Sequence, residues 1–215
     1  MNDITSRLAC APVVPLIQAD DPSVAIATAR ALAKGGLTVL EVVLRTPAAL
    51  ECLQALCALD DDIVVGAGTV LNAKKTHDCI ERGAAFIVSP GLDEGSVHAA
   101  QSQDVPIYPG VMTPSEVMRA ISLGLDVVKF FPASIAGGVP ALKALGSVFG
   151  ELKFMPTGGV SAANLHEFLA VPSVLACGGS WLTPKAAIAD GDYEQVTTLA
   201  SEAIKIATQT RGEQK

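Results

Sequence analysis

Residues 38–47 read TVLEVVLRTP, an aliphatic and β-branched run that ends in a threonine before a proline. Such a run predicts a buried strand, and the Thr-Pro pair predicts the start of a helix directly after it. Similar apolar runs recur along the chain, each followed by a turn residue and then by a helical period. We therefore expect eight strands, at residues 13–17, 38–44, 63–66, 85–89, 105–108, 126–131, 152–156 and 174–177.

A helix is predicted after each of these strands. The expected ranges are 22–34, 47–59, 73–82, 93–103, 114–123, 138–149, 161–170 and 192–208. Asp21, Thr46 and Thr113 each precede a proline, which is an N-cap residue type followed by a residue favoured at the first helical position. Eight strand–helix units in 215 residues predict a single α/β domain over residues 1–215, a compact (β/α)8 TIM barrel.

An open, doubly wound sheet is the alternative fold. It typically carries a G-x-G-x-x-G motif after its first strand, whereas here the first strand is followed by Gln18, Ala19 and Asp20. The sequence therefore favours the barrel. Active sites of barrels lie at the carboxyl ends of the strands, so the polar residues that end each apolar run are the candidates for function.

The composition argues against several kinds of partner. With a net charge of −7, neither nucleic acid nor an anionic membrane is an attractive partner. Nothing in the sequence resembles a transmembrane span or a secretory signal. The five cysteines are scattered and form no C-x-x-C pair, which predicts a cytoplasmic protein with most of them in the core. The three histidines lie far apart, so we expect no metal site.

Charged residues interrupt two of the predicted strands. Lys129 lies within DVVKFFPA, residues 126–133. A buried, unpaired ammonium is costly, whereas a lysine buried as the neutral amine is a nucleophile toward carbonyl carbon. The alternative is a strand-end lysine that reaches solvent. Strand alternation also places Glu41 and Arg45 on one face. There Glu41 could act as an acid/base carboxylate and Arg45 could bind a substrate carboxylate. The alternative is that they belong to a structural ion pair.

Small residues follow several other strands. Thr69 ends a G-A-G-T turn that lets a ligand approach the backbone, and Pro90 follows the fourth strand in a turn. TGG at residues 157–159 and GGS at residues 178–180 follow the seventh and eighth strands, where barrels often bind phosphate. The alternative is that these segments are ordinary glycine turns.

Seven motifs together resemble the 2-keto-3-deoxy-6-phosphogluconate (KDPG) aldolase family, also described as bifunctional with 4-hydroxy-2-oxoglutarate (KHG). They are PVVP (12–15), LEVVLRT (40–46), VGAGTVLN (65–72), IVSPGL (87–92), KFFPA (129–133), PTGGVS (156–161) and GGSWL (178–182). The resemblance runs essentially from end to end, and each motif falls at the end of a predicted strand.

The resemblance implies a class I pyruvate aldolase that needs neither metal nor cofactor. Such an enzyme cleaves KDPG to pyruvate and glyceraldehyde 3-phosphate, and KHG to pyruvate and glyoxylate. By resemblance, Lys129 forms the Schiff base and Glu41 moves protons. The implied substrate-binding residues are Arg45 and Thr69 at the pyruvyl carboxylate, Pro90 and Phe131 in the pocket wall, Thr157 at the substrate hydroxyls, and Gly158, Gly159, Gly179 and Ser180 at the phosphate. The family is trimeric, which implies a homotrimer.

Three residues near the motifs need separate mention. Tyr108 and Met112 depart from the residues expected at the mouth of the fifth strand and put the substrate range in doubt, while Trp181 is expected to be structural. Three rival interpretations are an aldolase that prefers KHG or the phosphogalactonate isomer, a non-catalytic phosphosugar-binding barrel, and an enzyme like thiamine-phosphate synthase. Inward-facing Lys129 and Glu41 argue against the second, and the lack of an acidic cluster at the strand ends argues against the third.

Overall fold

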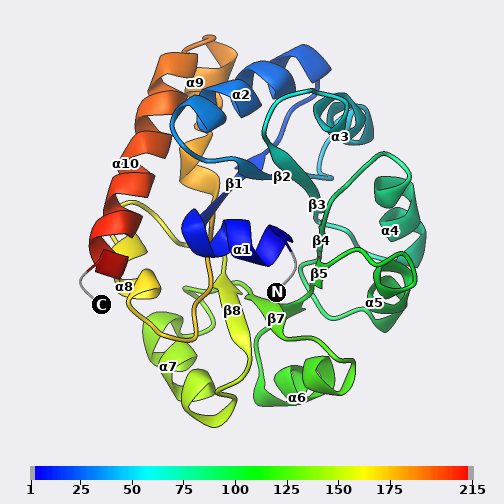
Figure 1. Ribbon diagram of the computed structural model, residues 1–215, viewed down its shortest axis with the longest axis vertical. Helices are drawn as coiled ribbons and strands as arrows, with labels where there is room; N and C mark the ends of the chain where they lie inside the picture. The colour runs from blue at the N-terminus through cyan, green and yellow to red at the C-terminus, as the bar shows by residue number, and fades with distance from the viewer. Residues whose placement is uncertain (1–2, 213–215) are drawn as a thin grey trace.

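The structure is a computed structural model that describes residues 3–212, in which helices surround a central group of strands (Figure 1). The strands are β1 (Val13–Ile17), β2 (Val39–Val43), β3 (Val64–Gly68), β4 (Ile87–Val88), β5 (Ile107–Tyr108), β6 (Gly110–Val111), β7 (Val127–Phe130), β8 (Lys153–Pro156) and β9 (Cys177–Gly179). The helices are α1 (Asp3–Cys10), α2 (Pro22–Lys34), α3 (Ala49–Cys57), α4 (Ala73–Ile80), α5 (Glu94–Gln101), α6 (Pro114–Ser122), α7 (Gly138–Val148), α8 (Leu165–Leu169), the 3-10 turn η1 (Ser180–Leu182), α9 (Lys185–Ala189) and α10 (Tyr193–Gly212).

All strand pairs among residues 3–212 are parallel. Six strands form one sheet in the order β5-β4-β3-β2-β1-β9, and β6, β7 and β8 form a second sheet. Only Pro109 separates β5 from β6, and two isolated bridges, Phe154 with Val174 and Thr157 with Gly178, join the second sheet to the segment that contains β9. The prediction of an α/β fold with parallel strands is therefore confirmed.

The last strand is displaced from its predicted position. The pattern predicted residues 174–177, whereas β9 pairs with β1 through Cys177–Gly179. Consecutive glycines are poor strand formers, so the pattern indicated a loop there. Glycine is nevertheless required at position 178, because a Cβ there would lie 2.3 Å from Oγ1 of Thr157. The helices α1 and α9 and the short strand β6 were not predicted.

Two of the three predicted N-caps are confirmed. The Asp21 carboxylate accepts hydrogen bonds at the start of α2, and Thr113 forms a capping box with Glu116 at the start of α6. The prediction for Thr46 was wrong, since α3 begins later, at Ala49. The Thr46 hydroxyl instead donates to the carbonyl of Ala19, which ties the loop after β2 to the loop after β1.

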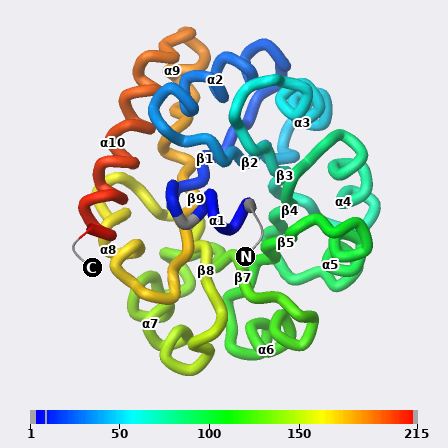
Figure 2. Tube along the Cα trace, in the orientation of Figure 1, coloured from blue at the N-terminus to red at the C-terminus, as the bar shows by residue number. Residues whose placement is uncertain are grey.

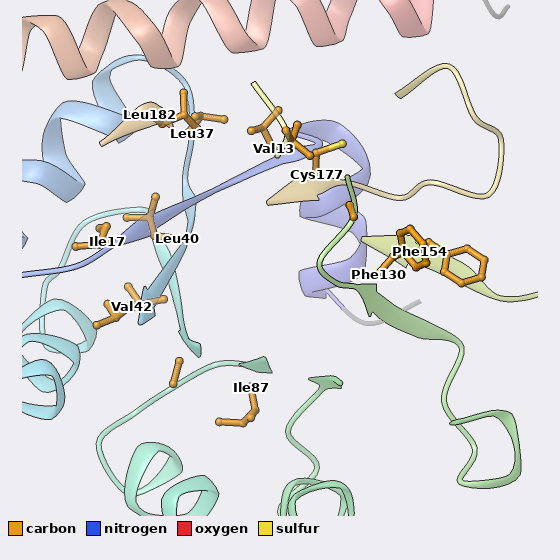
Figure 3. Packing of buried hydrophobic residues seen from close by; sticks show 14 of the residues in the cluster. Val13, Ile17, Leu37, Leu40, Val42, Ile87, Phe130, Phe154, Cys177 and Leu182 are labelled. Atoms are coloured by element: carbon orange, nitrogen blue, oxygen red, sulfur yellow. The ribbon is translucent and has the colours of Figure 1, made fainter. Parts of the chain in front are cut away.

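Strand alternation divides the buried side chains between two cores. Leu40, Val42 and Phe130 belong to the main core, which packs the strands against the surrounding helices (Figure 3). Val39 and Val127 face the other way, into a smaller cluster with Leu8 of α1. Helix α1 lies over the middle of the strands in Figures 1 and 2, and the early positions of these valines in their strands place it at the amino ends. The carboxyl ends remain open for a site.

Tyr108 belongs to this smaller cluster, which corrects the expectation that it lies at the mouth of its strand. Its side chain is buried beside Phe86, with ring centroids 5.9 Å apart. Burial raises the pKa of the Tyr108 hydroxyl to about 12. Tyr108 is therefore a core residue, whereas Met112 is exposed.

Most of the cysteines behave as small core residues, as expected. Cys52, Cys79 and Cys177 are buried. Burial raises the pKa of the Cys79 thiol to about 12 and that of the half-buried Cys57 to about 11, so both remain protonated near neutral pH. Among residues 3–212, no helix is both long and apolar enough to cross a membrane.

Candidate active site

Lys129 and Glu41 face each other on the side of the strands that points away from the surrounding helices. Lys129 follows the core residue Val128 in β7, and Glu41 follows the core residue Leu40 in β2, so alternation turns both charged side chains away from the surrounding helices. Their side chains are 4% and 3% exposed, and Nζ of Lys129 lies 3.9 Å from Oε1 of Glu41. The sequence-based expectation that the two side chains share one inward face is confirmed.

Glycine at position 68 makes room for the Glu41 carboxylate. Gly68 ends β3, next to β2 in the sheet, and a Cβ built on it would lie 1.9 Å from Oε1 of Glu41 and 2.6 Å from its Cδ. Buried carboxylate oxygens normally have hydrogen-bond partners, yet Oε1 of Glu41 has none among the described residues. The lysine at 3.9 Å is a charge partner beyond hydrogen-bond distance, and this separation suits a bridging hydroxyl or water.

An aromatic ring and a proline loop lie beside Lys129. Its Nζ lies 5.1 Å from the centroid of the Phe131 ring, whose negative face stabilises a cation. Gly110 pairs with Lys129 in register, and a Cβ on Gly110 would lie 2.1 Å from the carbonyl oxygen of Pro90. The loop after β4 is therefore pressed against the strand next to Lys129, which brings Pro90 into the same neighbourhood.

Arg45 and Thr69 form a second pair at the carboxyl ends of β2 and β3. Nε of Arg45 donates to Oγ1 of Thr69 at 3.1 Å. Thr69 adopts φ of +59°, a left-handed conformation that is uncommon for a β-branched residue. Among the described residues, no ion pair within 4.0 Å joins Arg45 to Glu41, so the interpretation of a structural pair between these two is wrong. The guanidinium retains its terminal N–H groups for a ligand.

The loops after β7 and β8 are joined by backbone hydrogen bonds. The amide of Ala133 donates to the carbonyl of Thr157 at 2.8 Å, and the amide of Ser134 donates to the carbonyl of Gly158 at 3.0 Å. Gly158 and Gly159 adopt φ of +94° and +81°, which favours glycine at both positions. The Ser134 hydroxyl lies against Gly159, where a Cβ would be 1.8 Å from it.

Gly179 and Ser180 lie one strand further along. Gly179 ends β9 and Ser180 begins η1, and the bridge between Thr157 and Gly178 connects this segment to the glycine loop after β8. Trp181 packs against Gly179, since a Cβ there would lie 2.7 Å from the indole ring. Trp181 therefore packs beside the loop after β9, and its structural role stays a prediction.

A cleft of about 770 Å³ opens between the loops after β1, β2 and β9. Two of the expected site residues, Arg45 and Ser180, line it. Lys129 and Glu41 do not line it, but Leu16, which pairs with Glu41 in register, does. The cleft therefore lies next to the buried pair, on the side of β1 and β9.

Sequence reasoning missed several residues of this region. Gly68 was read only as part of a turn, whereas in the structure it pairs in register with Val43 of β2, the strand that carries Glu41. Gln18 and Lys185 line the cleft, and neither lies in a motif that the sequence singled out. Lys185 begins α9, which was itself not predicted.

The arrangement provides an amine, a carboxylate and a guanidinium around one end of the strands. A buried amine adds to ketones, a carboxylate within about 4 Å exchanges protons with the adduct, and a guanidinium binds a carboxylate. Within residues 3–212, no group of three or more His, Cys, Asp or Glu side chains is arranged to hold a metal ion.

Comparison with known proteins identifies the family. The sequence model described as "KDPG and KHG aldolase" matches residues 4–199. The chain belongs to this aldolase family. It is 45% identical to the KHG/KDPG aldolase of Escherichia coli K12 over 200 residues, which is 93% of this chain and 94% of the relative.

Two solved structures of the family have closely similar folds. The KDPG aldolase of Zymomonas mobilis ZM4, solved with 3-phosphoglycerate, is 45% identical with a TM-score of 0.88, over 94% of this chain and 95% of that one. The KDPG aldolase of Legionella pneumophila, solved with pyruvate captured as a covalent carbinolamine, is 40% identical with a TM-score of 0.89, over 93% of this chain and 97% of that one.

We predict that Gly68→Ala lowers the free energy of unfolding by about 1–3 kcal/mol, because its methyl group overlaps the Glu41 carboxylate. Urea denaturation of both single variants and of the double variant with Glu41→Ala measures the coupling, and the cost of the extra methyl group should fall when Glu41 is truncated. Gly91→Ala is the control, since nothing lies within 4 Å of a Cβ there. An equal cost of Gly68→Ala in both backgrounds would show that Glu41 is not what the methyl group displaces.

Proposed function

We propose that this chain is a class I aldolase that reversibly cleaves KDPG to pyruvate and glyceraldehyde 3-phosphate, and also KHG to pyruvate and glyoxylate. The observation that carries the proposal is the buried contact between Lys129 and Glu41. Family membership supports it, as does the carbinolamine captured in the Legionella relative, which is an amine adduct of a keto acid.

The reaction begins at Lys129. Its neutral amine attacks the keto carbon of the substrate to form a carbinolamine, which then loses water to give a protonated imine. The proton lost by the attacking nitrogen and the proton gained by the departing hydroxyl both need an acid/base group, and Glu41 is the carboxylate nearest Nζ among the recorded ion pairs. The ring of Phe131 lies beside the nitrogen that carries the positive charge.

The imine then accepts the electron pair of the bond that breaks. Removal of the proton from the C4 hydroxyl releases the aldehyde, and the electrons of the C3–C4 bond move into the imine to leave an enamine. Protonation of the enamine at C3 restores an imine, which water hydrolyses to pyruvate and free Lys129. Glu41 serves as base and then as acid in these steps, directly or through a bridging water.

The remaining expected residues bind the two ends of the substrate. Arg45 and Thr69 take the pyruvyl carboxylate, and their mutual hydrogen bond fixes the guanidinium in place. Pro90 and Phe131 form the wall near the imine, and Thr157 contacts the substrate hydroxyls. The phosphate binds to the joined loops that contain Gly158, Gly159, Gly179 and Ser180, which is supported by the left-handed glycines and the exposed serine at this end.

The same proposal covers the architecture. We infer that the two sheets close into one (β/α)8 barrel that forms a single domain, since the bridges beside β8 and the continuity of β5 with β6 support closure. By resemblance, the protein works as a homotrimer without a cofactor. Its cytoplasmic location stays a prediction of the cysteine pattern.

The rival interpretations differ in strength. A non-catalytic phosphosugar-binding barrel would not need an amine and a carboxylate buried in contact, so the pair at 3.9 Å disfavours it. An aldolase for the phosphogalactonate isomer would retain Lys129 and Glu41. The names of the relatives at about 40–45% identity favour KDPG and KHG over that isomer.

Pyruvate release from KDPG, KHG and the phosphogalactonate isomer, followed with lactate dehydrogenase, tests this function. We expect turnover of KDPG by the wild-type chain and none above background by Lys129→Met, since no other amine can form the imine. Lys205→Met on α10 is the control, and circular dichroism checks that each variant is folded. Near-normal turnover by Lys129→Met would rule out the Schiff-base mechanism.

For Glu41→Gln we predict a slower reaction by about 10²- to 10⁴-fold in kcat, because the amide cannot exchange a proton. Imine formation with pyruvate should remain possible, although slower, since Lys129 is still present. Turnover kinetics and pyruvate adduct formation are measured side by side, with Glu51→Gln on α3 as the control. An unchanged kcat would reduce Glu41 to a structural partner of Lys129.

A further inference from the structure

The cleft between the loops after β1, β2 and β9 has four charged residues in its lining. They are Asp20, Asp21, Arg45 and Lys185. Two of these charges are already engaged, since Asp21 caps α2 and Arg45 donates Nε to Thr69. The hydroxyls of Thr46 and Thr183 are engaged as well, in hydrogen bonds to backbone carbonyls that tie the cleft's loops together.

Lys185 is the second cation of this lining. None of the ion pairs recorded within 4.0 Å among residues 3–212 includes it, and its side chain is exposed. Without Lys185 the charged lining would carry two carboxylates and one guanidinium, a net charge that opposes an anion. With it the two carboxylates in the lining are balanced by two cations.

Arg45 and Lys185 stand on opposite sides of β1. Arg45 follows β2, Lys185 follows β9 and η1, and both of these strands pair with β1. The two cations therefore belong to opposite walls of the cleft, one on each side of β1. KDPG carries a carboxylate at one end and a phosphate at the other, so it can present one anion to each wall.

We propose that Lys185 is a specificity-determining residue that binds the terminal phosphate of the substrate at the end of the cleft remote from Arg45. The Ser180 hydroxyl, which lines the same cleft five residues earlier in the chain, donates to the same group. This inference rests on the proposed aldolase function and adds the source of its preference for a phosphorylated substrate. An ammonium is a point charge that pairs well with phosphate dianions, and hydrogen bonds to charged groups are the strong ones.

Steady-state kinetics of Lys185→Met with KDPG and with its unphosphorylated analogue 2-keto-3-deoxygluconate, which lacks the second anion, provide the test. We expect the ratio of kcat/KM for KDPG to that for 2-keto-3-deoxygluconate to fall about 10-fold, chiefly through the KM for KDPG. Lys185→Arg retains the charge and should keep most of the ratio. Lys143→Met, an exposed lysine on α7, is the matched control and should leave the ratio unchanged.

The outcomes separate this inference from the function on which it rests. If the wild-type chain releases no pyruvate from either substrate, the proposed function fails, and the inference fails with it. If the wild-type chain is active and Lys185→Met retains the wild-type ratio, or loses activity equally on both substrates, only the role of Lys185 is overturned. A loss of the ratio in Lys185→Arg as large as in Lys185→Met would also contradict a charge-based role.

Discussion

The structure depends on the burial of an ammonium and a carboxylate next to each other. Taking either charge out of water alone costs several kcal/mol, so Lys129 and Glu41 are tolerable in this interior only because they lie 3.9 Å apart. That distance leaves Oε1 of Glu41 without a hydrogen bond among the described residues. An unsatisfied buried oxygen is unfavourable for stability. In this position, however, the carboxylate of Glu41 and the amine of Lys129 can both act on a substrate bound beside them.

Glycines around the pair create the space that it needs. At Gly68 a side chain would occupy the position of the Glu41 carboxylate, and at Gly178 it would occupy that of the Thr157 hydroxyl. The close approach of backbone to side chain at these two points positions functional groups that come from different strands. The glycines of this chain therefore contribute to the site in two ways. Some allow tight turns at the strand ends, and others, within the strands, leave room for the side chains of neighbouring residues.

Much of the fold and the central pair could be predicted from the sequence, because both follow from local periodicity. Alternation in β2 and β7 turns Glu41 and Lys129 inward, and the main-core positions of Leu40 and Val128 confirm this. The position of β9 could not be predicted, because Gly178 and Gly179 are required by close contacts with Thr157 and Trp181 rather than by strand propensity. The placement of Tyr108 in the core and of Lys185 in the cleft could not be predicted either, since each depends on which distant elements pack nearby.

The most direct test of this account is borohydride reduction in the presence of pyruvate, followed by intact-protein and peptide mass spectrometry. Borohydride converts the imine to a stable secondary amine, so the adduct marks the reacting lysine without requiring turnover. The account predicts a single pyruvyl adduct on the peptide that contains Lys129. An absence of adducts, or their distribution over exposed lysines such as Lys74 and Lys75, would contradict it.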